Sequence, residues 1–142
     1  MKVKQLTISS IRAFNRYYTK LLGLLNRHLL NSDYSLVEAR IIYEIHTNGP
    51  LSASQMMSEI EIDKGYLSKV LKQFEHAGLI SKQRAVEDAR ITLLSLTAKG
   101  AALFTKLNSA SEMQIEMLID KLTAEEQRQL VGHMQAIQQL LQ

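Results

Sequence analysis

Basic and hydroxyl side chains gather within one short stretch of this chain, residues 64–72. Apolar residues recur there every three or four positions, which predicts a helix with one buried face. The residues available for contacts lie on the other face or at the start of the helix, and they are Lys64, Gly65, Tyr66, Ser68, Lys69 and Lys72. Such a helix fits the major groove of DNA, where lysine and hydroxyl groups reach phosphates and base edges. A merely solvated helix face is the alternative interpretation.

The residues that follow favour DNA over that alternative. Two β-like runs, 79–84 and 90–96, flank the charged segment 85–89, and this pattern predicts a hairpin. Arg84 closes the first run and Arg90 opens the second. An arginine at a hairpin tip can enter the minor groove, where negative potential is concentrated. Two short helices followed by a hairpin make the winged variant of the helix-turn-helix.

Other kinds of chemistry find little support. The 142 residues include no cysteine, which excludes disulfides, thiolate metal sites and cysteine nucleophiles. The four histidines, at 28, 46, 76 and 133, are too far apart in sequence to form a metal-binding motif. A Gly-x-Ser-x-Gly motif and a glycine-rich phosphate loop are both missing. We therefore predict no enzymatic activity, no catalytic residue, no metal and no cofactor.

Helix signals surround the basic stretch. Three helix starts carry a capping box, in which a Ser or Thr and a Glu or Gln three residues later satisfy each other's backbone N–H: Ser35 with Glu38, Ser52 with Gln55, and Thr123 with Glu126. Asp63 is placed to cap the basic helix, and Gly78 lies just past its end. The predicted helices are a long first one before residue 34, then 36–47, 53–60, one from residue 64, one after Thr97 and a last one after Thr123. The fold class is mainly α with a small β-hairpin wing.

Composition sets the remaining limits. With 46% hydrophobic residues, the chain can bury a core as one domain. The formal net charge is +3, which permits an anionic partner, while the last third of the chain is acidic and least suited to phosphate. The sequence has neither the apolar run of a signal peptide nor a membrane span. We predict a cytoplasmic protein without a membrane partner.

The segment Asp88–Gly100, DARITLLSLTAKG, resembles the wing signature of the MarR family of bacterial transcriptional regulators. That signature reads Asp-x-Arg, a short strand, and Leu-Thr-x-x-Gly. Many members carry glycine between Asp and Arg, where this chain has Ala89. The resemblance extends over the whole chain, from the long first helix to two closing helices.

The resemblance implies an organisation and a function. Residues 1–142 would form a single MarR-like domain, with dimerisation helices at 1–34 and 101–142 and a winged helix-turn-helix DNA-binding lobe at 35–100. A homodimer would bind an inverted repeat in double-stranded DNA as a ligand-responsive repressor, with Asp88 orienting Arg90 at the wing tip. A small-molecule effector would bind between the lobe and the dimerisation helices, near Tyr18, Tyr43 and His46.

Two alternatives remain open. Residues 13–19, 35–40 and 63–68 also resemble the regulator half of two-domain proteins that join a MarR-like domain to a GNAT-type N-acetyltransferase. The acetyltransferase half is absent from this chain, so acetyl transfer does not follow. The other alternative is a winged-helix module that binds a protein partner and never DNA, and the basic helix face argues against it.

Overall fold

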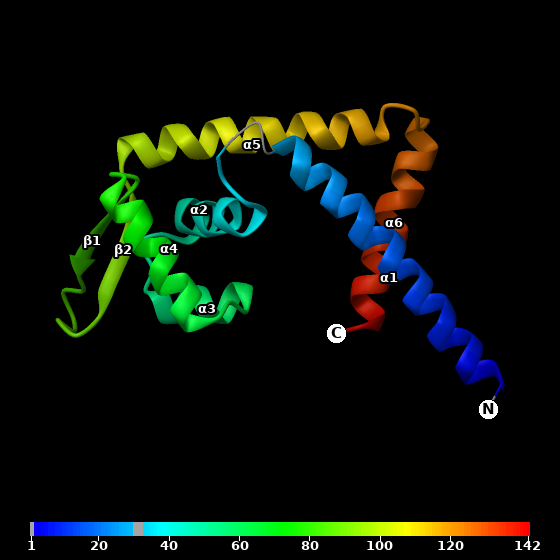
Figure 1. Ribbon diagram of the computed structural model, residues 1–142, viewed down its shortest axis with the longest axis horizontal. Helices are drawn as coiled ribbons and strands as arrows, with labels where there is room; N and C mark the ends of the chain where they lie inside the picture. The colour runs from blue at the N-terminus through cyan, green and yellow to red at the C-terminus, as the bar shows by residue number, and fades with distance from the viewer. Residues whose placement is uncertain (1, 30–32) are drawn as a thin grey trace.

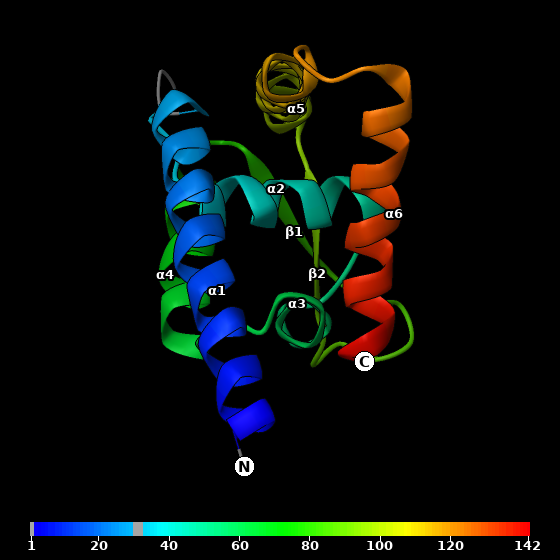
Figure 2. The ribbon, with the colours of Figure 1, turned by 90° about the vertical axis from the view of Figure 1, so that its right-hand side faces the viewer.

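The computed structural model describes residues 2–29 and 33–142 and, for residues 25–29, the backbone alone. In this part of the chain the helices and strands are α1 (Lys2–Leu29), α2 (Leu36–Asn48), α3 (Ala53–Ile60), α4 (Lys64–His76), β1 (Ile80–Arg84), β2 (Thr92–Leu96), α5 (Ala98–Ile119) and α6 (Ala124–Leu140). The long α5 leads away from the hairpin toward α6 (Figure 1). Viewed end-on, α5 has α1 on one side and α6 on the other (Figure 2). The predicted fold class is confirmed: a mainly helical chain with a two-stranded wing.

Side-chain caps set where the helices begin. Each of the three predicted capping boxes is formed, and its two hydrogen bonds measure 2.8–3.2 Å. The Asp63 carboxylate accepts from the Tyr66 N–H at 3.0 Å and starts α4, while Thr97 starts α5. Hydrogen bonding from Thr123, first through its backbone, lowers the pKa of Glu126. The predicted helix starts are therefore confirmed.

A glycine ends the basic helix. Gly78 has φ of +75°, in the left-handed region, and its N–H donates to the Glu75 carbonyl at 3.0 Å. The Leu79 N–H donates to the Phe74 carbonyl at 2.9 Å. This pair of bonds is a Schellman motif, and it leads the chain from α4 directly into β1.

The hairpin is shorter than predicted. β1 pairs antiparallel with β2, from Ile80 opposite Leu96 to Arg84 opposite Thr92. β2 begins at Thr92 because Asp88 draws Arg90 and the next residue into the turn: its side chain accepts from the Arg90 N–H, and its carbonyl accepts from the Ile91 N–H at 3.0 Å. Leu51 extends the sheet by a single bridge to Leu94.

The core lies within the lobe that the sequence placed at 35–100. Twelve buried apolar residues from α2, α3, α4, the hairpin and their connections form one cluster: Ile41, Ile42, Ile45, Leu51, Met56, Leu67, Val70, Leu71, Phe74, Leu79, Ile80 and Leu94. From α5, Leu103 and Phe104 pack against this cluster. Burying apolar surface between these elements holds α4 and the wing in a fixed relation.

Apolar side chains remain exposed on α1, α5 and α6. Examples are Val3, Leu6, Met117, Val131 and Ile137, between 41% and 77% exposed. The side chains of Leu25, His28 and Leu29, and residues 30–32, lie outside the described part of the chain. Across residues 2–29 and 33–142, every helix is too short or too polar to span a bilayer.

Candidate nucleic-acid interface

Helix α4 divides into a buried and an exposed face. Leu67, Val70, Leu71 and Phe74 are at most 5% exposed and pack into the core. The six residues that sequence analysis selected on this helix are all exposed: Lys64, Gly65, Tyr66, Ser68, Lys69 and Lys72. Their hydroxyl and ammonium groups therefore face solvent along one side of the lobe.

A groove of about 290 Å³ runs between α3, α4 and the hairpin. Three lysines line it, Lys64 and Lys72 from α4 and Lys82 from β1. Hydroxyl groups of Ser54, Ser68 and Thr92 also line it, over an apolar floor that includes Leu67 and Leu94. Ammonium and hydroxyl groups around one groove suit an anion such as a phosphate, because each of them can donate to its oxygens. We call this the lysine groove.

Three of the six polar residues of the lysine groove, Lys64, Ser68 and Lys72, are residues that the sequence predicts to bind DNA. The other three, Ser54, Lys82 and Thr92, were not predicted. Lys82 stands opposite Leu94 in the hairpin, and cross-strand partners point to the same face of a sheet. The alternation along residues 80–84 would have placed Lys82 on the core side with Ile80, but only the pairing shows that this side borders α4.

One carboxylate from α4 also reaches the hairpin. The Lys82 ammonium lies 2.8 Å from a Glu75 carboxylate oxygen, and both side chains are partly exposed. This ion pair joins the last turn of α4 to β1. It also places a negative charge beside one of the three lysines of the groove.

The wing tip is built around Asp88. Its carboxylate accepts from the Arg90 backbone N–H at 3.0 Å and from the guanidinium at 3.1 and 3.2 Å. These bonds, those from the Arg90 side chain first, lower the pKa of Asp88. The Arg90 side chain is 91% exposed, so its guanidinium stays open to solvent while the Asp88 carboxylate holds it on one side. Ala89 has no positive φ, and alanine therefore fits the turn. Arg84, also exposed, lies opposite Thr92 at the other end of this turn.

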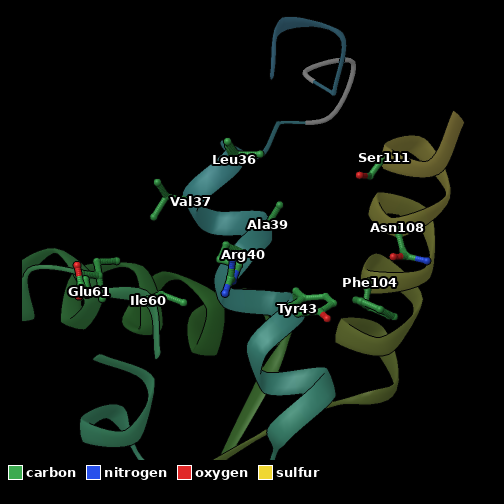
Figure 3. Close-up of a pocket in the computed structure, with 11 residues that line it drawn as sticks. Leu36, Val37, Ala39, Arg40, Tyr43, Ile60, Glu61, Phe104, Asn108 and Ser111 are labelled. Carbon is green, nitrogen blue, oxygen red and sulfur yellow. The ribbon is translucent and has the colours of Figure 1, made fainter. Parts of the chain in front are cut away.

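A second cavity, of about 490 Å³, lies between α2, the α3–α4 connection and α5. Tyr43 points from α2 toward Phe104 of α5, and Asn108 and Ser111 follow along α5 (Figure 3). The Arg40 guanidinium also borders this cavity, and it donates to the buried Glu44 carboxylate at 2.9 Å. The remaining lining residues are Leu36, Val37, Ala39, Ile60, Glu61 and Ile62. We call this the α2–α5 cavity.

Two of the three predicted effector residues, Tyr43 and His46, meet at the Phe104 ring, and Tyr18 does not join them. Tyr43 lines the α2–α5 cavity. His46 instead stacks on Phe104 at 3.7 Å between ring centroids, and Tyr18 stacks on Phe14 within α1 at 5.6 Å. Arg40 and Phe104 were missed. Arg40 lies one helical turn before Tyr43, but only the packing of α5 shows which side of α2 borders the cavity.

In the described ranges, 2–29 and 33–142, no three His, Asp or Glu side chains lie together in a way that could hold a metal ion. The geometry therefore offers two features for chemistry: a lysine-lined groove beside a projecting arginine, and a largely apolar cavity with one guanidinium at its edge.

Known proteins are similar to this chain in sequence. A family model described as the MarR family matches residues 34–92. The chain is 34% identical over 101 residues to the organic hydroperoxide resistance transcriptional regulator of Bacillus subtilis (strain 168), which covers 71% of this chain and 64% of that protein. It is 32% identical over 81 residues to the HTH-type transcriptional regulator YdgJ of the same strain, covering 57% and 49%. The matches thus span about half to just under two-thirds of these curated relatives, whose names describe regulators and not enzymes.

Solved structures share the fold. The crystal structure of the MarR family transcription regulator SP03579 matches with a TM-score of 0.82 at 18% identity, covering 99% of this chain and 92% of that one. Streptococcus pneumoniae FabT in complex with DNA matches with a TM-score of 0.78 at 24% identity, covering 92% and 96%. None of these descriptions mentions an acetyltransferase, and the resemblance to acetyltransferase fusions stays a prediction.

Proposed function

The chain belongs to the MarR family, and from this premise we propose that it is a transcriptional regulator that binds double-stranded DNA sequence-specifically as a homodimer. The observation that carries the proposal is the joining of the lysine groove to the exposed face of α4, with Arg90 projecting from the adjacent wing. Cationic groups on one helix and one hairpin tip can contact the major groove and the neighbouring minor groove at the same time.

Each residue of this surface then has a role. Ser68, Lys69 and Lys72 lie in the major groove and contact bases and phosphates. Lys64, Gly65 and Tyr66 meet phosphate at the start of α4, where the Asp63 carboxylate already caps the Tyr66 N–H and the exposed Lys64 ammonium and Tyr66 hydroxyl make the contacts. Arg90 enters the minor groove, and Arg84 contacts the backbone beside it.

A second copy of the chain covers the exposed apolar side chains of α1, α5 and α6. These side chains have no cover within one described chain, and burying them is favourable. A two-fold axis between the copies presents two α4 helices to one face of DNA. The operator is then an inverted repeat with half-sites about 10 bp, or a multiple of that, apart.

The α2–α5 cavity holds the effector of a ligand-responsive repressor. Its apolar walls and the Tyr43 and Phe104 rings suit a flat aromatic body, and the Arg40 guanidinium suits an attached carboxylate or phenolate. Helix α2 belongs to the lobe, whereas α5 leads toward α6. A ligand between α2 and α5 therefore shifts the lobe relative to the dimerisation helices and releases DNA.

The test is selection of bound duplexes from a random pool by the purified protein at about 150 mM salt, where nonspecific binding is weak. We expect an inverted repeat to be enriched. Affinity for it should fall with salt with a slope near −6 on logarithmic axes, for about three or four phosphates neutralised per lobe.

A matched pair of variants sharpens the test. Arg90→Ala should weaken binding and flatten the slope by about 1 per wing, whereas Lys121→Ala, between α5 and α6, should change neither. A folded dimer that enriches no sequence, or whose affinity is independent of salt, would contradict the proposal and favour a protein partner for the lobe.

A further inference from the structure

The end of α4 is tied to the beginning of α5 across three consecutive carbonyl groups. The Thr97 N–H donates to the Leu79 carbonyl at 3.0 Å, and the Thr97 hydroxyl donates to the Gly78 carbonyl at 2.6 Å. The Lys99 ammonium donates to the Ala77 carbonyl at 2.8 Å. The two helices thus meet where one ends and the other starts (Figure 1).

Lys99 lies at a position of its own helix where a positive charge is unfavourable. It is the second residue of α5, where unpaired N–H groups carry partial positive charge and a cation is unfavourable. No carboxylate of the described residues forms an ion pair with it. The end of α4 carries partial negative charge on its last carbonyls, and an ammonium there is favourable. The position of the Lys99 ammonium is therefore explained by the end of α4 and not by α5.

The backbones are also too close for a side chain between them. A Cβ added at Gly100 would collide with the Leu79 carbonyl oxygen and also touch the Leu96 side chain. The close approach brings the first turn of α5 within reach of the turn that ends α4. It leaves the lysine stem free to cross to Ala77.

We propose that Lys99 is a positioning residue, which fixes the C-terminal end of the recognition helix α4 to the first turn of α5. The inference rests on the proposed DNA binding. With this bond in place, α4 and the first turn of α5 move as one rigid body, and the orientation of α4 in the major groove follows that of α5. Lys99 touches no DNA in this role.

The test compares three variants: Lys99→Met removes the ammonium, Lys99→Arg restores a donor, and Lys106→Met removes an exposed lysine two turns further along α5. We expect Lys99→Met to lower affinity for the selected operator about two- to tenfold, as for loss of one hydrogen bond. The salt slope should not change, since no phosphate contact is lost. Lys99→Arg should recover most of the affinity, and Lys106→Met should match the wild type.

Hydrogen exchange tests the tie without DNA. In Lys99→Met, the amides of residues 77–79 should exchange faster than in Lys106→Met, while amides of the α2 core stay protected. Unchanged exchange at 77–79 would overturn the inference, as would a salt slope flattened by about 1 per lysine lost, which marks a direct phosphate contact. A wild type that binds no operator would instead contradict the proposed function, and the exchange result would still decide the role of Lys99.

Discussion

Asp88 illustrates how a single residue can have two opposing effects on an anionic partner. Its carboxylate repels phosphate, but it also holds the Arg90 guanidinium through two hydrogen bonds and the Arg90 backbone through a third. The neighbouring carboxylate, Glu87, is exposed at the same wing tip. Comparing the two carboxylates separates charge from orientation.

We expect Asp88→Ala to weaken operator binding about three- to tenfold, although it removes a negative charge. Without the Asp88 carboxylate, the Arg90 side chain is no longer held in one rotamer, and binding must order it. Glu87→Gln should leave binding unchanged or tighten it. Fluorescence anisotropy with labelled operator measures both. Tighter binding by Asp88→Ala would show that charge outweighs orientation at the wing.

The same pair predicts a pH dependence. Hydrogen bonds from Arg90 lower the pKa of Asp88 below its ordinary value, so the ordering of the wing is present above that value and is lost only as pH falls through the lowered one. The affinity ratio between wild type and Asp88→Ala should therefore stay constant between about pH 8 and pH 5. A ratio that collapses near about pH 6 would mean that a histidine, and not Asp88, controls the wing.

Residue type and helical spacing were sufficient to predict which polar side chains of α4 are exposed. Lys64, Ser68 and Lys72 lie on the exposed face of one helix, and 3.6-residue periodicity identifies that face. Lys82 and Thr92 reach the lysine groove through strand pairing, and Arg40 reaches the α2–α5 cavity through helix packing. Such contacts join residues far apart in the chain, which local patterns do not encode.

At the scale of elements, α4 and the hairpin are joined by the Glu75–Lys82 ion pair. We expect Glu75→Gln to tighten DNA binding and steepen the salt slope, because it frees the Lys82 ammonium and removes a nearby negative charge. Lys82→Met should do the reverse. Titrations at several salt concentrations measure both slopes. Weaker binding by Glu75→Gln would mean that the pair matters more for holding the wing than for its charge.

The close packing of α5 on the end of α4 makes its own prediction. Gly100→Ala should destabilise the fold by about 1–3 kcal/mol, because the added methyl meets the Leu79 backbone. Gly132→Ala in α6 has no heavy atom within 4 Å of its new methyl. It should stabilise its helix by about 0.5–1 kcal/mol. Denaturant unfolding compares them, and equal effects would contradict the packing argument.

The boundaries of elements were more predictable than their contacts. The capping boxes, Asp63 and Gly78 act within a few residues of themselves, and each marks a helix end in the structure. The second strand was predicted to begin two residues too early. Residues 90–91 have a β-like composition, but their hydrogen bonds to Asp88 keep them in the turn. Local hydrogen bonding outweighed strand propensity at that point.

At the scale of the whole molecule, assembly depends on the exposed apolar side chains of the outer helices. We expect Ile137→Glu to convert a dimer to a monomer and to abolish binding to a two-half-site operator, because a buried charge opposes the interface. Gln135→Glu places the same charge on the far side of α6 and should leave the dimer intact. Light scattering gives the masses, and a dimeric Ile137→Glu would place the interface elsewhere.

The length of α5 has a mechanical consequence. Its 22 residues form a rod roughly 33 Å long, with α4 and the wing attached at one end. Tilting such a rod by about 6° about its far end moves the near end by about 3.4 Å, which equals the rise of one base pair. Phe104, Asn108 and Ser111 of the α2–α5 cavity lie along this rod. A molecule that wedges the cavity open acts on a lever arm, and the end of α5 that carries α4 moves about 1.5 to 3 times as far as the residues that line the cavity.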